Sequence, residues 1–393
     1  MNIHASHHLP QPDAGALEHS EQLKTLIAKE ISEAGPMTFA RYMQLALYAP
    51  GLGYYNSGKQ KFGKNGDFIT APELSPLFAQ CLGRQCAQAL QIIGGGNILE
   101  FGAGSGIMAA DILLELEKLH CLPEHYYILE VSPDLKQQQH QTLLNRAPTL
   151  LERVQWINQL PSAPFTGVIL ANEVLDAMPA HRFYCDDKQI QEYFVTLQEN
   201  QFMWDKSIPS DTLLRRQIEH LQKEYLGSIP YSSEINLLIT PWIAAISTLL
   251  KQGLILLIDY GFPRQEYYHP DRNQGTLMCH YRHRAHSDPF LFVGLQDITC
   301  HVDFTTIAEA AQSCGLTLSG YTNQASFLIG SGLADILQTN QYHSELEQFN
   351  ANQQVKLLTS PSEMGELFKV MSLTRQLDHS LLGFSFQNKL HRL

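Results

Sequence analysis

Apolar residues occur along the chain in short blocks that are separated by amphipathic stretches. Blocks with the length and composition of buried strands lie at 97–101, 126–132, 166–172 and 254–260, with a shorter one at 154–157. Amphipathic stretches typical of helices follow the blocks at 97–101 and 126–132. Strands that alternate with helices connect through right-handed crossovers and build a parallel sheet. The pattern therefore predicts an α/β protein with a doubly wound core.

The chain before the first strand is predicted to be mostly helical. Residues 1–20 are rich in His and Pro, and we expect a flexible tail there. Residues 21–95 are predicted to contain two amphipathic helices, a Gly-rich loop and a third helix. We expect the loop to lie beside the ligand site that is described below. The core then extends over 96–393. Within it we interpret the charged, less regular stretch at 181–235 as an insertion, and the polar stretch at 331–360 as a second, helical insertion.

The charge balance narrows the class of partner. The 393 residues include 27 Lys and Arg against 39 Asp and Glu, which gives a net charge of −12. Such a charge repels phosphate backbones and anionic membranes. We therefore expect no nucleic-acid partner, and a basic peptide is the more natural macromolecular one.

Cysteine usage and hydropathy bear on the compartment. The seven cysteines are scattered and form no Cys-x-x-Cys pair, which indicates a reducing environment. No apolar run approaches the roughly 20 residues that a membrane helix needs, so membrane insertion is not expected. The first residues resemble neither a secretory signal nor an Arg-rich presequence. The expectation is a cytoplasmic protein, or one of the mitochondrial matrix if a presequence has been removed.

A glycine-rich loop follows the first strand, with the sequence Glu-Phe-Gly-Ala-Gly-Ser-Gly at 100–106. A strand, such a loop and a helix N-terminus together make a nucleotide-type site. A dinucleotide fingerprint would need glycine at position 107, where Ile107 stands, and would bring a pyrophosphate close to Glu100. S-adenosylmethionine carries a sulfonium and an ammonium group instead, so the acid becomes an attraction. We predict this cofactor, bound through Glu100, Gly102, Gly104 and Gly106.

An acid at the end of the second strand completes this constellation. Glu130 stands where a carboxylate can accept hydrogen bonds from both ribose hydroxyls, although either class of cofactor would use it in that way. Two alternatives remain open at this point. The loop can be a tight turn without a ligand, and Glu130 can be a solvated strand end.

The loop before the third helix offers further polar candidates. Asp67 lies in a Gly-flanked loop and is a candidate contact for the methionine ammonium. Thr70 and Glu73 have the spacing of a capping box, so Thr70 serves equally well as a helix cap or as a cofactor contact. His280 and His286 belong to a series that matches no recognised ligand pattern, and we expect no metal.

Several stretches together carry a family resemblance. GDFITAPELSPLFA, ILEFGAGSG, ANEVLDAMPAHRF and DITCHVDFT occur in this order, and NQGTLMCHYRHRAHSDP and LTSPSEMGELFKVM extend the set. The chain resembles the MidA-like methyltransferases over nearly all of its length beyond about residue 20. The resemblance implies a class I methyltransferase fold, Rossmann-like, with a mostly parallel seven-stranded sheet and added helical elements. It also implies S-adenosylmethionine as the donor and, as in the mitochondrial members, an arginine of the respiratory NADH dehydrogenase as the acceptor.

The resemblance also suggests which residues adjoin the cofactor. By motif match these are Gly66, Asp67, Thr70, Gly102, Gly104, Glu130, Asn172 and Glu173.

The acceptor would be bound at the carboxyl edge of the strand at 166–172. A guanidinium has a pKa above 12, so an enzyme that methylates it must bind a cation and hold one nitrogen in line with the sulfonium methyl. Glu173 and Asp176 can clamp such a group bidentately, with Asn172 beside them, and these three are the predicted catalytic residues. The alternatives are that Asp176 caps a turn and that Glu173 is only a strand-end acid. Asp259 lies at the same edge, where it either assists in binding the acceptor or caps the turn at Gly261.

The sequence thus predicts a protein-arginine methyltransferase that acts on a subunit of respiratory complex I during assembly. Two rival hypotheses stay open. One is an assembly chaperone that binds S-adenosylmethionine without transferring the methyl group, and the other is a small-molecule methyltransferase.

Overall fold

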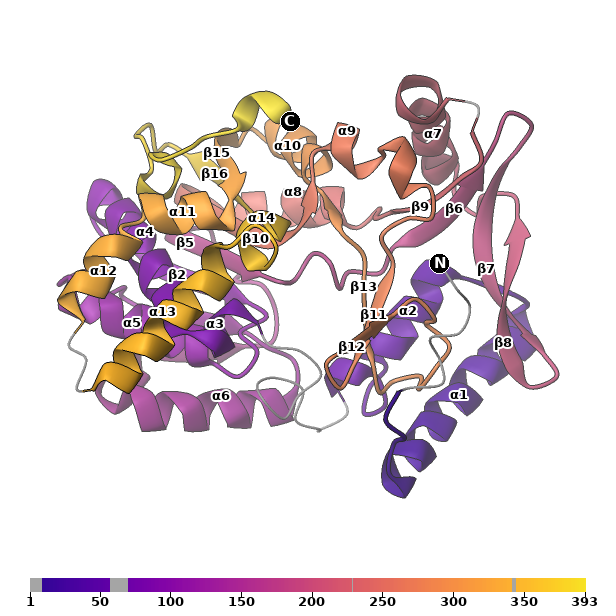
Figure 1. Cartoon of the computed structure of the whole chain (residues 1–393), viewed down its shortest axis with the longest axis horizontal. Coiled ribbons are helices and arrows are strands. Elements are labelled where there is room, and N and C mark those ends of the chain that lie inside the picture. The colour runs from indigo at the N-terminus through magenta and orange to yellow at the C-terminus, as the bar shows by residue number, and fades with distance from the viewer. Residues whose placement is uncertain (1–8, 57–69, 228, 341–343) are drawn as a thin grey trace. The chain divides into compact units, whose positions relative to one another are not determined.

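The chain folds into two compact units. A computed structural model describes residues 9–56, 70–227, 229–340 and 344–393 (Figure 1). The first unit combines Met1–Phe68, Asp176–Ile239 and Arg264–His301, and the second combines Ile69–Leu175, Thr240–Pro263 and Val302–Leu393. The chain therefore passes between the units five times.

A mixed sheet forms the centre of the second unit. Its strand order is β15-β16-β10-β5-β2-β3-β4, and the short strand β14 also pairs with β10. Neighbouring strands from β10 to β4 are parallel, whereas β16 is antiparallel to both β10 and β15. The predicted doubly wound, mostly parallel sheet of seven strands is confirmed, with β14 as an addition. The strands are β2 (Asn97–Phe101), β3 (Tyr126–Leu129), β4 (Val154–Ile157), β5 (Phe165–Asn172), β10 (Leu250–Phe262), β14 (Val302–Asp303), β15 (Thr317–Asn323) and β16 (Phe368–Arg375).

Helices of the second unit begin where the sequence supplies caps. Ser75 accepts a hydrogen bond from the backbone of α4, and Ser132 does the same for α6; a proline follows each of them at the first helical position. Gly94 ends α4 in the left-handed conformation. The helices are α3 (Ala71–Leu74), α4 (Pro76–Ile93), α5 (Ile107–Lys118), α6 (Pro133–Arg146), α8 (Ile239–Leu249), α10 (Phe304–Ser313), α11 (Gln324–Gly330), α12 (Leu333–Thr339), α13 (Glu345–Thr359) and α14 (Met364–Leu367).

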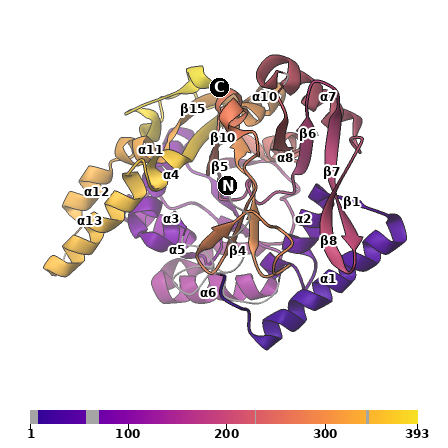
Figure 2. The ribbon, with the colours of Figure 1, turned by 45° about the vertical axis from the view of Figure 1, so that its right-hand side comes forward.

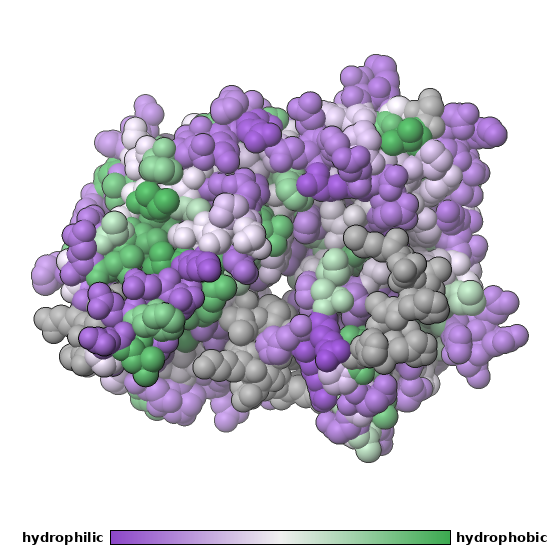
Figure 3. Space-filling model, in the orientation of Figure 1, coloured by the Kyte–Doolittle hydropathy of each residue, from purple (hydrophilic) through white to green (hydrophobic). Residues whose placement is uncertain are grey.

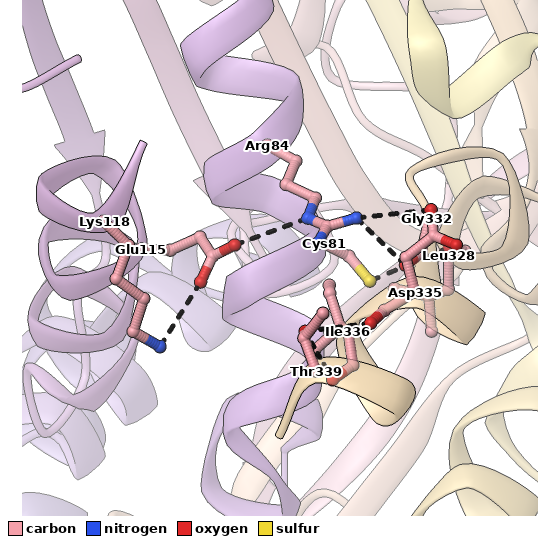
Figure 4. Close-up of polar contacts among 9 residues, drawn as sticks. All are labelled: Cys81, Arg84, Glu115, Lys118, Leu328, Gly332, Asp335, Ile336 and Thr339. Carbon is pink, nitrogen blue, oxygen red and sulfur yellow. Dashed lines mark hydrogen bonds and ion pairs between the residues drawn. The ribbon is translucent and has the colours of Figure 1, made fainter. Parts of the chain in front are cut away.

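The helices after β15 are held against α4 by an arginine. Arg84 on α4 donates to the carbonyl of Gly332 at 3.2 Å and to Glu115 of α5 at 3.4 Å (Figure 4). The thiol of Cys81, one turn earlier on α4, donates to the carbonyl of Leu328 at 3.7 Å. Helices α11 and α12 are therefore fixed to α4 by polar contacts as well as by the shared apolar core.

Helix α13 exposes two large apolar side chains. Leu346 and Phe349 are 67% and 58% exposed, and Figure 3 shows apolar side chains gathered on the face that this helix presents. Within the described residues, no helix is both long enough and apolar enough to cross a bilayer.

The first unit is built on antiparallel pairs. Strands β1, β7, β6 and β9 form a sheet in that order, and β8 also pairs with β7. Strands β12, β11 and β13 form a second, smaller sheet. Helix α1 lies against β7 (Figure 2). The elements are α1 (Ala14–Ala34), β1 (Met37–Thr38), α2 (Phe39–Tyr48), β6 (His181–Cys185), β7 (Ile190–Gln198), β8 (Gln201–Ser207), α7 (Thr212–Leu221), β9 (Tyr231–Ile235), α9 (Arg264–Tyr267), β11 (Met278–Tyr281), β12 (Arg284–His286) and β13 (Asp297–Thr299).

The stretch at 181–235, read from the sequence as irregular, contains four of these strands. Strands β7 and β8 form a hairpin whose turn residues, Glu199 and Asn200, both have positive φ. The sequence does not show this hairpin, because β8 is largely exposed and its turn lacks the usual glycine.

Candidate cofactor and active site

The glycine loop connects β2 to α5 through three residues in the left-handed conformation. Gly102, Gly104 and Gly106 have φ values of +65°, +53° and +84°. A Cβ atom on Gly106 would lie 2.9 Å from the Cα of Gln139 on α6, and one on Gly102 would lie 2.9 Å from a methyl of Val174. The loop therefore requires glycine both for its conformation and for the closeness of its neighbours.

Glu100 is completely buried at the end of β2. The hydroxyl of Tyr126 on β3 donates to its Oε2 at 2.8 Å. In the described part of the chain, Oε1 has no hydrogen-bond partner. Burial raises the pKa of this carboxyl to about 7, and the hydrogen bond from Tyr126 opposes that rise only in part. A buried acid of this kind is ionised more readily when a cation comes near it.

Glu130 follows β3 and is also buried, so it is not a solvated strand end. Its Oε1 accepts from the backbone N–H of Ser132 at 2.8 Å, and its Oε2 accepts from the side-chain amide of Gln139 at 3.1 Å. Each carboxylate oxygen has two lone pairs. Both oxygens can therefore still accept a hydroxyl proton from a ligand.

Thr70 occupies the N-cap position of α3, but its side chain makes no cap hydrogen bond. Glu73 instead accepts a hydrogen bond from the hydroxyl of Ser105 in the glycine loop. The reciprocal capping box suggested by the spacing is therefore absent from the described contacts, and α3 is tied to the loop. Gly66 and Asp67 lie outside the described residues.

The chain turns sharply after β5, at Glu173. This residue has φ of +52°, which is uncommon for a side chain other than glycine. Its N–H donates to the carbonyl of Ile258 at 2.9 Å. The next two N–H groups, of Val174 and Leu175, both donate to Oδ2 of Asp259, at 3.2 and 2.9 Å. Asp259 thus caps the turn after β5, whereas the sequence suggested a cap beside Gly261 on its own strand.

Two neighbours hold the carboxylate of Glu173. The amide of Asn172 donates to Oε1 at 3.3 Å, and the hydroxyl of Tyr260 donates to Oε2 at 3.2 Å. The ring of Tyr260 packs on Phe368 of β16, with 4.1 Å between centroids. The Oδ1 atom of Asn172 is buried and has no hydrogen-bond partner among the described residues. The turn therefore presents an oriented acid and an amide oxygen.

Asp176 begins the second of the three segments of the first unit and is buried. Its carbonyl accepts from the N–H of Cys300 at 3.0 Å. Burial raises the pKa of Tyr48 and of Tyr55 in the same unit, and the charges of Asp297 and Asp176 add to the rise. The predicted clamp of Glu173 with Asp176 joins residues of different units and stays a prediction.

Gln139 is one of the site residues that the sequence does not single out. It stands among several glutamines on a polar helix, and no spacing marks it. In the described part of the chain, no group of three or more His, Cys, Asp or Glu side chains is arranged to hold a metal.

The strand order, the antiparallel β16, the glycine loop after β2 and the acid after β3 define a class I methyltransferase that uses S-adenosylmethionine. The chain belongs to the family described as "Putative S-adenosyl-L-methionine-dependent methyltransferase", whose model matches residues 81–322.

Known proteins support this assignment over the whole length. A crystal structure from Burkholderia thailandensis with S-adenosyl-homocysteine bound is 42% identical, covers 98% of this chain and 100% of that one, and has a TM-score of 0.94. The protein arginine methyltransferase NDUFAF7 homolog of Drosophila melanogaster is 28% identical, with 95% and 92% of the two chains covered. Its Homo sapiens counterpart is 27% identical, with 88% and 81% covered.

Proposed function

We propose that this methyltransferase acts on an arginine side chain of a protein, and that the protein is a subunit of respiratory complex I or its bacterial equivalent. The curated relatives are named protein arginine methyltransferases, and the MidA-like resemblance supplies the respiratory target. The observation that carries the proposal is the strained turn at Glu173, whose carboxylate is oriented by Asn172 and Tyr260.

The donor side fits S-adenosylmethionine. This cofactor supplies a methyl group on a positively charged sulfur. Glu100 has one buried carboxylate oxygen without a donor in the described part of the chain, which suits a cationic ligand. Glu130 would bind the ribose hydroxyls through its remaining lone pairs, and Gly102, Gly104 and Gly106 would allow close approach of the ligand to backbone. Gly66, Asp67 and Thr70 would complete the cofactor contacts from the other loop.

The acceptor side fits a guanidinium. Glu173 would accept hydrogen bonds from N–H groups of the arginine and balance its charge. Asp176 remains the second predicted acid for this role. Asn172 would add an amide oxygen as an acceptor for a third N–H. These residues would hold one guanidinium nitrogen in line with the methyl group, which is the main requirement of a displacement at carbon.

The proposed compartment rests on the sequence and on the names of the relatives. The curated relatives are named mitochondrial. We place this chain in the cytoplasm, or in the mitochondrial matrix if a presequence has been removed, in either case with its protein acceptor.

Methyl-labelled S-adenosylmethionine and purified complex I subunits test the proposal. The wild type is expected to label arginine in one subunit, and Glu173→Gln is expected to lose at least 90% of the transfer while it keeps cofactor affinity. Glu117→Gln, an exposed change on α5, is the matched control. Cofactor binding without any transfer would favour the chaperone hypothesis, and labelled metabolites without labelled protein would favour a small-molecule substrate.

A further inference from the structure

We propose that Gln139 is a positioning residue for the cofactor: it fixes Glu130 and the glycine loop at one distance from each other. The proposal rests on the proposed role of Glu130 in binding the ribose. Gln139 lies on α6 and is fully buried, so we expect it to act through Glu130 and the loop and not by touching the ligand.

The side chain of Gln139 joins three elements and is fully buried. Its amide nitrogen donates to the carbonyl of Gly104 at 3.1 Å and to Oε2 of Glu130 at 3.1 Å. Its Oε1 accepts from the indole N–H of Trp156 on β4 at 2.9 Å. All three bonds are made within the second unit.

The indole decides which way the amide faces. A tryptophan N–H can only donate, so the amide oxygen must face Trp156 and the NH2 group must face Gly104 and Glu130. The two amide protons are then shared between the glycine loop and the ribose acid. A shift of either partner would stretch one of these bonds.

The backbone of Gln139 makes the same link by packing. Its Cα is the atom that a Cβ on Gly106 would approach to 2.9 Å. Side chain and backbone of one residue therefore both set the distance between α6 and the loop. Among natural residues only an amide of this length can donate to two oxygens while it accepts from an indole.

The hydrogen bond to Glu130 has an electrostatic effect as well. Donors to a carboxylate favour its ionised form, which is the form that accepts from two hydroxyls. Replacement of Gln139 would leave Glu130 with one oxygen unsupported, so that the carboxylate can turn away from the ribose. The effect should therefore depend on the ribose hydroxyls of the ligand.

Calorimetry on the full chain with S-adenosylhomocysteine and with its 2′,3′-dideoxy analogue tests this dependence. Gln139→Met keeps the shape but removes both donors, and we expect it to weaken binding of S-adenosylhomocysteine about tenfold. Binding of the dideoxy analogue should change less than about twofold. Gln141→Met on the exposed side of α6 is the control, because Gln141 bonds only to Asn145 among its described contacts.

Two further variants keep the test decisive if Gln139→Met folds poorly. Trp156→Phe removes the N–H that orients the amide and shortens the ring, but it leaves both donors of Gln139 in place. It should show a smaller loss with the same dependence on the ribose hydroxyls. In a Glu130→Gln background, Gln139→Met should have almost no additional effect.

Equal losses of affinity for both ligands would overturn the proposal, because Gln139 would then not act through the ribose contacts of Glu130. If the wild type failed to bind S-adenosylhomocysteine, both the cofactor role of Glu130 and the positioning role of Gln139 would be overturned. The arginine acceptor is absent from these measurements, so a failure of the acceptor assignment leaves their outcome unaffected.

Discussion

Glu100 is a single residue at which cofactor binding and pH meet. Its carboxyl is buried, bonds to one tyrosine, and has a pKa of about 7 against an ordinary value of 4.5. The folded protein therefore holds this proton more tightly than the unfolded chain does. The free energy of unfolding must fall as the pH rises from about 4.5 to about 7, because folding then leaves a buried charge.

This sign predicts the behaviour of Glu100→Gln without cofactor. The variant cannot ionise, so its stability relative to the wild type should increase between pH 5 and pH 8, by up to about 3 kcal/mol. Urea unfolding at the two pH values measures the change. A difference that stays constant with pH would contradict the assignment. With cofactor present the wild type should regain the advantage, since a cation stabilises the ionised acid.

The turn at Glu173 predicts an unusual order of stability. Glycine adopts a positive φ without strain and alanine does not, so Glu173→Gly should be more stable than Glu173→Ala by about 1 kcal/mol. At Gln141, which is exposed in the interior of α6, the order should be reversed by a similar amount. Chemical denaturation of the four variants checks both signs. Both Glu173 variants should lack methyl transfer, and an active Glu173→Gly would contradict the proposed role.

At the scale of elements, the glycine loop depends on how closely α6 approaches it. Gly106 and Gly94 have similar φ values, +84° and +80°, but only Gly106 has a neighbour in the way of a Cβ. Gly94→Ala should therefore cost about 1 kcal/mol of stability, whereas Gly106→Ala should cost about 2 to 4 kcal/mol. Affinity for S-adenosylhomocysteine, measured by calorimetry, should fall at least tenfold in Gly106→Ala alone. Similar losses of stability in both variants would contradict this expectation and indicate that α6 can move to accommodate the added methyl group.

The polar attachment of α12 to α4 gives a second prediction at this scale. Arg84 serves a backbone carbonyl and the nearly buried Glu115, so Arg84→Ala should lower the free energy of unfolding by about 2 kcal/mol. Asp335 pairs with the same arginine at 3.7 Å but is 73% exposed, and Asp335→Ala should cost less than about 0.5 kcal/mol. Thermal unfolding of both variants measures the contrast, and equal losses would be evidence against it.

The elements that the sequence predicts well are those in which pattern and caps agree. The strands before residue 172 and the helices opened by Ser75-Pro76 and Ser132-Pro133 are of this kind. The hairpin of β7 and β8 is not, because its outer strand has little apolar surface to reveal it.

The same contrast holds in the candidate site. The glycines and Glu130 follow from the loop motif and the strand end. Gln139, Tyr126 and the capping by Asp259 depend on contacts across the fold, between residues that no sequence spacing relates.

At the scale of the whole molecule, the first unit is made from three separate segments of chain, and two of them lie between parts of the second unit in sequence. Neither unit can be expressed as one continuous piece. Experiments therefore need the full chain. Because five chain connections join the two units, unfolding of one unit is expected to affect the stability of the other.

The position of β16 has a consequence for synthesis on the ribosome. This strand lies between β10 and β15 in the sheet but follows both in the chain. A nascent polypeptide that has emerged only as far as residue 367 contains both neighbours without the strand that joins them. The backbone N–H and C=O groups at that edge of β10 are then unpaired and open to other chains. The closing strand arrives late, and until then the growing protein is a natural client for a chaperone.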